Sequence, residues 1–174
     1  MARRKGPALT RTSPRARIAI VEDDPILRED LAGVVTQADG MEVSGVADTL
    51  AAGRVLIEPG LDVLLIDLAL PDGNGVSLIR EARERVPTIK IIVVSIFGDA
   101  RSVVRAIEAG ADGYLLKGAG EQQAEEAIRS VLGGGAPISP AVASHILTRM
   151  RERASAAAGA AEPDARLTEK ETAI

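Results

Sequence analysis

The chain has 174 residues, with 25 Asp and Glu against 21 Lys and Arg, one His and no Cys. The lack of Cys excludes disulfides, thiol nucleophiles and thiolate metal sites, and a single His makes a His-rich metal site or a His-centred catalytic triad a poor candidate. Two aromatic residues, Phe97 and Tyr114, are too few for stacking on nucleic-acid bases. Carboxylates are plentiful, so we expect any site to be built from oxygen, which suits hard cations such as Mg²⁺.

The charge is distributed unevenly. Residues 1–17 carry six basic side chains and no acidic one, which leaves 15 basic and 25 acidic residues, a net charge of −10, on the rest. Such an acidic body argues against DNA binding by the globular part itself. We expect residues 1–16 to be a basic, disordered leader. No apolar run is long enough to span a bilayer or to form a secretory signal, so a cytoplasmic protein without membrane contact is expected.

Short apolar runs predict five strands. The third and fourth runs are almost entirely apolar, as in strands buried on both faces of a parallel sheet. Their alternation with helical patterns predicts an α/β fold, a doubly wound parallel sheet with helices on both faces. Right-handed crossovers and the chain length favour the flavodoxin-like (βα)5 strand order 2-1-3-4-5. The predicted strands are Arg17–Val21, Glu42–Ala47, Asp62–Ile66, Ile89–Ser95 and Gly113–Leu116.

Apolar residues at helical spacing predict a helix after each strand. The first begins at Pro25, where proline is tolerated, with Asp23 or Asp24 as its cap. The second, about Leu50–Ile57, is short. Gly110 lies where a left-handed cap would end the fourth helix.

The pattern changes after Gly133-Gly134-Gly135. We therefore assign residues 17–136 to the α/β domain and residues 137–166 to a linker. Within the linker, Pro140–Arg153 is predicted as an amphipathic helix, and Ala154–Ala165, broken by Gly159 and Pro163, as an Ala-rich linker. Residues 167–174 have the pattern of a capped helix start.

Polar residues follow four of the five predicted strands. Glu22-Asp23-Asp24 follow the first, and Asp67, Ser95 and Lys117 follow or end the third, fourth and fifth. In the predicted order these strands are neighbours, so their carboxyl-terminal side chains should converge on one rim. One acid at a strand end is usually a helix cap, but the joint pattern indicates a site. Clustered acids repel unless a divalent cation binds them, and a hydroxyl with an ammonium suits an adjacent phosphoryl group.

Four segments carry a resemblance to a known family. They span about residues 17–133 and together resemble the receiver domain of bacterial two-component response regulators, in particular the NarL/LuxR-type branch. The closing LTEKETAI (167–174) resembles the start of the helix-turn-helix DNA-binding output domain of that branch, truncated here. The four segments are VEDDP (Val21–Pro25), LLIDLALPDGNG (Leu64–Gly75), VVS (Val93–Ser95) and AGADGYLLK (Ala109–Lys117).

The resemblance implies a phosphoacceptor and a metal site. Asp67 would accept a phosphoryl group from the phosphohistidine of a sensor histidine kinase or phosphotransfer protein. A Mg²⁺ or Mn²⁺ ion would be held by Asp23, Asp67, the backbone carbonyl of Ala69 and, through water, Glu22. The domain would be a signalling module rather than an enzyme, although it assists its own phosphorylation and dephosphorylation.

The resemblance also implies a phosphate site and a switch. Lys117, the Ser95 hydroxyl and the Ile96 backbone amide would bind the phosphoryl oxygens. Phosphate would draw Ser95 toward it, which lets Tyr114 turn inward and reshapes the face made by the fourth helix, fifth strand and fifth helix. Phosphorylation-dependent homodimers and transcriptional control, with DNA bound only through the missing C-terminal domain, are the expected output.

Three other functions are weighed against this interpretation. A Mg²⁺-dependent aspartyl-phosphate hydrolase typically has a second Asp two residues after its nucleophile, where this chain has Ala69. A nucleotide-binding flavodoxin-like protein would need a Walker-type or GxGxxG loop after the first strand, and none is present. A receiver-like interaction module that works without phosphate stays open, because the bulky Ile96 stands where the family usually has a small residue.

Overall fold

The computed structural model describes residues 14–96 and 98–159. Most of the predicted basic leader and the whole of the predicted helix-turn-helix start, residues 167–174, lie outside the described residues. Within the described ranges, no helix is both long enough and apolar enough to cross a membrane.

Five parallel strands form the central sheet, in the order β2-β1-β3-β6-β7. This is the predicted 2-1-3-4-5 order, because β6 and β7 are the fourth and fifth strands of this sheet. Each observed strand starts within one residue of its predicted start and ends at the predicted residue. The strands are β1 (Ala16–Val21), β2 (Met41–Ala47), β3 (Val63–Ile66), β6 (Lys90–Ser95) and β7 (Gly113–Leu116).

A second, two-stranded antiparallel sheet was not foreseen from the sequence. β4 (Ala69–Leu70) pairs with β5 (Gly73–Asn74) directly after β3. Both strands have only two residues, too few for a period-two pattern to be visible in the sequence. The hairpin occupies the loop that leads away from the end of β3.

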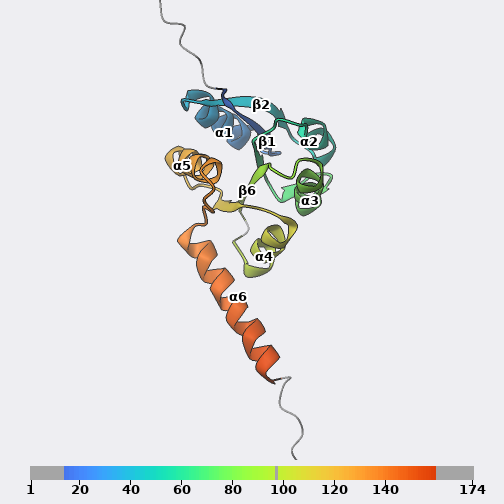
Figure 1. Cartoon of the computed structure of the whole chain (residues 1–174), viewed down its shortest axis with the longest axis vertical. Helices are drawn as coiled ribbons and strands as arrows, with labels where there is room; N and C mark the ends of the chain where they lie inside the picture. Colours follow the sequence, from blue (N-terminus) through green and yellow to red (C-terminus); the bar gives the residue numbers. More distant parts are fainter. Residues whose placement is uncertain (1–13, 97, 160–174) are drawn as a thin grey trace, which may run out of the picture.

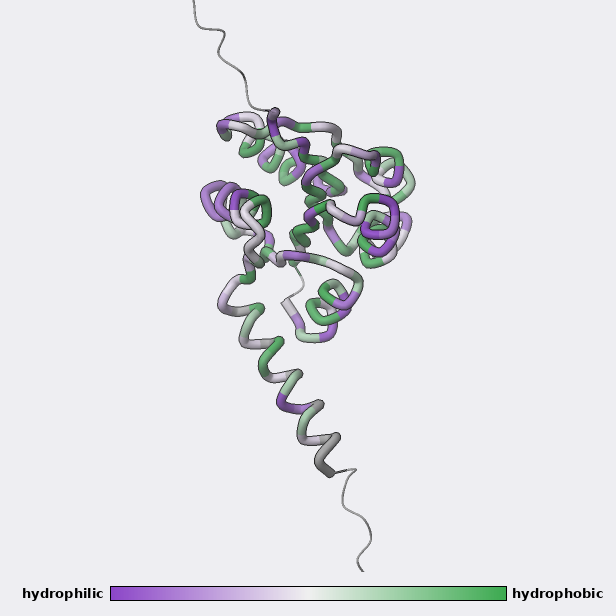
Figure 2. Tube along the Cα trace, viewed as in Figure 1, coloured by the Kyte–Doolittle hydropathy of each residue, from purple (hydrophilic) through white to green (hydrophobic). Residues whose placement is uncertain are grey.

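Helices cover both faces of the central sheet (Figure 1). On one face lie α1 (Pro25–Gln37) and α5 (Glu121–Leu132), and on the other α2 (Leu50–Leu56), α3 (Val76–Arg85) and α4 (Ala100–Ala109). Two apolar clusters result, one on each side of the sheet. All four residues of β3 are buried, because this central strand is covered on both faces. The helices turn their apolar sides toward the sheet and their hydrophilic sides outward (Figure 2).

The ends of α1 and α4 have capping residues that the sequence predicts. The Asp24 side chain accepts hydrogen bonds from the backbone N–H groups of Ile26 and Leu27, and Pro25 is the first residue of α1. Asp24 is therefore the cap of the two candidates. Gly110 ends α4 with φ 114° and ψ 17°, a left-handed conformation that glycine adopts without steric cost.

The last described helix is longer than predicted. α6 (Pro140–Gly159) continues past the predicted helix end at Arg153 into the Ala-rich stretch. The predicted end was too early because alanine has the highest helix propensity and the first breaker, Gly159, comes only at the observed end. The helix extends away from the α/β domain (Figure 1).

Two helical glycines should respond in opposite ways to alanine. In an open helix position, Gly→Ala stabilises by about 0.5–1 kcal/mol. A Cβ on Gly33 would have its nearest contact at 3.7 Å, so Gly33→Ala should raise the free energy of unfolding by about that amount. A Cβ on Gly53 would lie 2.9 Å from Leu78 Cδ2 and 3.0 Å from Val21 Cγ2, so crowding of about 1–3 kcal/mol should outweigh the helix gain. Urea unfolding checks both signs; equal shifts would contradict the packing.

Candidate functional site

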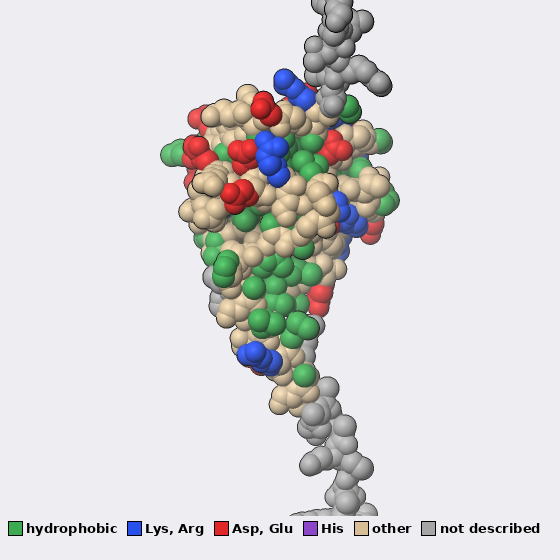
Figure 3. Space-filling view, turned by 60° about the vertical axis from the view of Figure 1, so that its left-hand side comes forward, with side chains coloured by type: hydrophobic (Ala, Val, Ile, Leu, Met, Phe, Trp, Pro, Cys, Tyr) green, Lys and Arg blue, Asp and Glu red, His purple; other side chains and the backbone are tan. Residues whose placement is uncertain are grey.

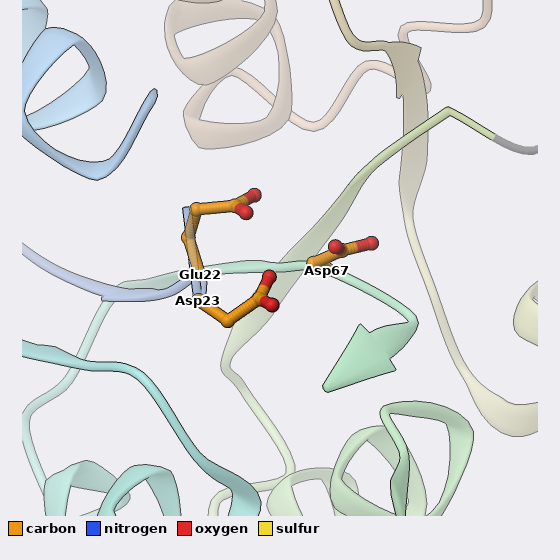
Figure 4. Close-up of side chains that lie close together, drawn as sticks. All are labelled: Glu22, Asp23 and Asp67. Carbon is orange, nitrogen blue, oxygen red and sulfur yellow. The ribbon is translucent and has the colours of Figure 1, made fainter. Parts of the chain in front are cut away.

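Three carboxylates meet at the carboxyl-terminal edge of the sheet (Figure 4). Glu22 and Asp23 follow β1, and Asp67 follows β3. These strands are hydrogen-bonded neighbours with Val21 opposite Ile66, so the residues that come next are neighbours too. One oxygen from each carboxylate lies within 4.8 Å of the others. The structure thus brings Glu22, Asp23 and Asp67 together, as the sequence predicts.

A lysine from a more distant strand joins the acids. Lys117 follows β7, two strands away from β3, and its Nζ lies 2.7 Å from Glu22 Oε1 and 2.8 Å from Asp67 Oδ2. The Glu22 and Asp67 side chains are only 1 % and 3 % exposed, and that of Lys117 is 17 % exposed. At this burial an ion pair is little screened by solvent, so the three groups form one charged cluster.

Burial and pairing set the proton affinities in this cluster. Burial raises the pKa of Glu22 above its ordinary value, although hydrogen bonds from the Lys117 side chain and the Asp24 backbone oppose the change. Burial by itself would lower the pKa of Lys117, but its hydrogen bonds to Asp67 and Glu22 outweigh burial and raise that pKa. Lys117 is therefore held firmly as an ammonium between two carboxylates.

The donor set fits a hard divalent cation. Glu22 Oε2 is buried and has no hydrogen-bond partner among the described residues, which is costly for a carboxylate oxygen. It belongs to the same group as Asp67 and the exposed Asp23. Three carboxylates and no nitrogen or sulfur ligand are the chemistry that Mg²⁺ or Mn²⁺ prefers.

The β4–β5 hairpin holds the chain around Asp67. Asp67 Oδ1 accepts a hydrogen bond from the Ala69 backbone N–H at 3.2 Å. Gly75 closes the hairpin, and its N–H donates to the Leu68 carbonyl at 2.9 Å. A Cβ at Gly75 would lie only 2.3 Å from the Asp67 carbonyl oxygen, so no larger residue fits. The Asp72 carboxylate accepts from the first backbone N–H groups of α2 and ties the hairpin to that helix.

Asp72 and Gly75 were missed as positioning residues in the sequence. The glycine-rich stretch after Asp67 signals a turn there. It does not signal which backbone atoms the turn approaches, because those contacts are made only in the folded chain.

Ser95 and Tyr114 form a second, uncharged pair beside the cluster. Ser95 is the last residue of β6. Tyr114 lies on β7, opposite Val93 of β6, and the side chains of Ser95 and Tyr114 are both fully buried. Burial raises the pKa of Tyr114 to about 12, and a side-chain hydrogen bond with Ser95 opposes that rise. The Ile96 side chain is 67 % exposed, so most of its bulk is directed at solvent.

Residues 18–129 match the sequence profile of the family described as response regulator receiver domain. The chain belongs to this family. The predicted resemblance is therefore confirmed, and receiver domains of response regulators are signalling domains rather than classical enzymes. The predicted phosphoacceptor, Asp67, lies within the matched range.

The relatives are described as a transcriptional regulatory protein and a response regulator. The uncharacterized transcriptional regulatory protein YhcZ of Bacillus subtilis is 35 % identical over 140 residues, which cover 79 % of this chain and 64 % of YhcZ. The response regulator GacA of Pseudomonas viridiflava is 33 % identical over 134 residues, which cover 75 % of this chain and 61 % of GacA. The chain thus spans about three fifths of the length of these curated relatives.

Solved structures agree on fold and branch. A LuxR-family two-component response regulator from Aurantimonas sp. SI85-9A1 superposes with a TM-score of 0.72 at 29 % identity, covering 80 % of this chain and 99 % of its own. A CheY-like response regulator receiver domain protein from Methanospirillum hungatei JF-1 gives a TM-score of 0.64 at 30 % identity, covering 69 % and 95 %. The flavodoxin-like (CheY-like) architecture and the LuxR-type relationship are both as predicted.

Removing the shared ammonium should destabilise the protein and create a response to Mg²⁺. Lys117→Met leaves the Glu22 and Asp67 carboxylates buried without their partner, so we expect a loss of about 2–3 kcal/mol at neutral pH. Added Mg²⁺ should recover part of that loss, because the cation replaces the missing positive charge. Urea unfolding with and without Mg²⁺ measures both effects.

Lys90→Met is the matched control. Lys90 is half-exposed and lies 3.7 Å from Asp112, away from the acid cluster, so its loss should cost at most about 1 kcal/mol and show no gain from Mg²⁺. Equal losses and equal Mg²⁺ responses in the two variants would contradict the charged cluster.

Tyr114 should ionise far above the normal range. It is the only tyrosine and the chain has no tryptophan, so tyrosinate absorbance reports this residue alone. The native protein should titrate at about pH 12, and the same chain in denaturant at about pH 10. Because the folded pKa is the raised one, the stabilising contribution is complete below about pH 10 and is lost as the pH rises through about 12. A native midpoint equal to the denatured one would contradict the burial of Tyr114.

Proposed function

We propose that this domain accepts a phosphoryl group on Asp67 from a sensor histidine kinase or a phosphotransfer protein, in a Mg²⁺-dependent reaction. The observation that carries the proposal is the buried carboxylate of Asp67, held beside two further acids and contacted by Lys117 at 2.8 Å. A single buried carboxylate without a partner would lower the stability of the fold. A cluster of carboxylates that can bind a divalent cation, next to an ammonium, suits phosphoryl transfer.

In this proposal the chain contributes mainly position and charge. An Asp67 carboxylate oxygen forms the new bond to phosphorus while the bond from phosphorus to the donor nitrogen breaks, and the electron pair of that bond stays on the donor. The Lys117 ammonium pairs with the phosphoryl oxygens, and the Ser95 hydroxyl and the Ile96 backbone amide donate to them. Catalysis is then positioning and charge neutralisation, by which the domain assists its own phosphorylation and dephosphorylation.

The cation would be held by Asp23, Asp67, the backbone carbonyl of Ala69 and, through water, Glu22. When bound, Mg²⁺ or Mn²⁺ supplies positive charge that offsets the crowded carboxylates and the phosphoryl oxygens. The unpartnered Glu22 Oε2 supports this assignment, because a buried carboxylate oxygen without a hydrogen bond gains most from a nearby cation or its water.

The output we propose is transcriptional. Ser95 and Tyr114 would transmit phosphorylation to the face formed by α4, β7 and α5, which controls homodimerisation. DNA would be bound only through a helix-turn-helix domain whose predicted start is residues 167–174, and residues 137–166 would link the two. YhcZ and a further relative, DegU of Brevibacillus brevis, are both transcriptional regulatory proteins by name, which supports a transcriptional output. We place the protein in the cytoplasm, with no membrane partner.

The acceptor assignment predicts a single covalent change. Incubation with Mg²⁺ and a small acyl phosphate should add one phosphoryl group to the intact protein, detected by mass spectrometry. Asp67→Asn should abolish the gain, because an amide oxygen is not a competent nucleophile here. Asp39→Asn, the same substitution at an exposed position between α1 and β2, should leave it unchanged, and removal of Mg²⁺ by a chelator should suppress it.

Other outcomes identify the competing functions. If the wild type gains no phosphoryl group from either the small donor or a phosphorylated donor protein, the domain works by protein contact alone. If an added phosphoester is turned over catalytically, the protein is an aspartyl-phosphate hydrolase.

A further inference from the structure

The segment before α6 covers the outer edge of the sheet. β7 is an edge strand, and the outer N–H and C=O groups of such a strand need a partner. The Tyr114 N–H donates to the Pro137 carbonyl at 2.9 Å, and Tyr114 and Ile138 form an isolated parallel bridge. The linker thus begins as a very short extra strand on β7, paired at Tyr114.

The first turns of α6 are built into the domain core. Val142 is fully buried and belongs to the same apolar cluster as Tyr114, Val103 and Ala106, the last two from α4. Ile146, one turn further, is partly buried against this cluster. α6 and α4 are in contact. The base of α6 is therefore docked on the domain beside α4, and the segment just before it lies on the edge of β7.

Further along α6, large apolar side chains are not covered by the domain. Leu147 and Met150 are large apolar residues of α6 that stay exposed. Apolar side chains gather over the middle and lower part of the face seen in Figure 3; most charged side chains lie over its upper part, and a basic group lies near its lower end. The docked patch of α6 consists of Val142 and Ile146, and the helix beyond them extends away from the α/β domain (Figure 1).

Tyr114 connects the docked patch with Ser95, which lies beside the acid cluster. Its hydroxyl shares a hydrogen bond with Ser95, and its backbone N–H holds Pro137. Its side chain is fully buried within the cluster that includes Val142. Because Tyr114 is buried in the cluster to which Val142 of α6 also belongs, we expect the inward position of its ring and the docking of α6 to depend on each other.

We propose that phosphorylation of Asp67 stabilises the docked position of α6, so that the direction of this helix is the first output of the switch. The inference rests on the phosphoacceptor role proposed above. A serine hydroxyl has one proton to donate and lone pairs to accept with. In the phosphorylated state Ser95 donates its proton to a phosphoryl oxygen, so its bond with Tyr114 takes the direction in which the Tyr114 hydroxyl donates and Ser95 accepts, and this bond holds the ring inward and the start of α6 in place. Without the phosphoryl group this chain of hydrogen bonds loses one end, and the undocked state gains population.

By linkage, docking must in turn strengthen binding at the acid site. The test uses the full 174-residue chain with beryllofluoride, a phosphoryl mimic, and Mg²⁺. In the wild type, beryllofluoride should slow amide hydrogen exchange at Tyr114 and at residues 142–146. Val142→Asp introduces a charge into the docked patch, so exchange at these amides should rise and the beryllofluoride affinity should fall by about fivefold or more.

Leu147→Asp is the matched control, because it introduces the same charge on the exposed side of the same helix. Its affinity should stay within about twofold of wild type, since coupling needs the docked contact. Slow exchange in β1 and β3 verifies that each variant is folded, and Val142→Ala replaces Val142→Asp if the charged variant is not.

The outcomes separate the two proposals. Wild-type binding of beryllofluoride with unchanged affinity in the Val142 variants overturns the coupling and leaves the phosphoacceptor role standing. The same holds if α6 exchange is unaffected or becomes faster with beryllofluoride. A wild-type chain that does not bind beryllofluoride at all overturns both.

Discussion

The contact of one lysine with two buried carboxylates is the interaction on which the site depends. Glu22, Asp67 and Lys117 come from the ends of β1, β3 and β7, so the contact exists only when three strands are in place. The Lys117 side chain must extend past β6 to reach Asp67. A long, flexible stem with a compact charge can do this, whereas a shorter basic side chain could not. The ammonium offsets part of the repulsion that would otherwise drive the acids apart.

The remainder of the fold supplies the rigidity that this charged rim requires. Buried charges and the unpartnered Glu22 Oε2 cost stability, and two apolar clusters on opposite faces of the sheet offset that cost. The central strand β3 is buried on both faces and carries Asp67, the proposed acceptor, directly after its last residue. The hairpin after it adds position, because Gly75 lets the backbone approach Asp67 more closely than any other residue would.

A second chain of contacts leads away from the rim through uncharged groups. Ser95 touches Tyr114, and Tyr114 touches the segment that starts α6. Because the ring of Tyr114 is fully enclosed in a close-packed core, a movement of Ser95 is passed on to the residues packed around that ring. The site and the linker helix are thus joined by contiguous packing, and the acidic rim can affect an element that it does not contact.

By itself, the sequence determined the parallel sheet and its order, the strand ends, the Gly110 cap, and the convergence of Glu22, Asp23, Asp67 and Lys117, and it narrowed the cap of α1 to Asp23 or Asp24. These features follow from short-range rules: burial gives a readable period, and neighbouring parallel strands end at one edge. Only the tertiary structure decided the β4–β5 hairpin, the close approach of Gly75, the full length of α6 and the contact between Tyr114 and Pro137. Two-residue strands carry no period, and contacts between distant segments exist only once packing has brought them together. The Ala-rich residues 154–158 continue α6 because none of them breaks the helix that precedes them.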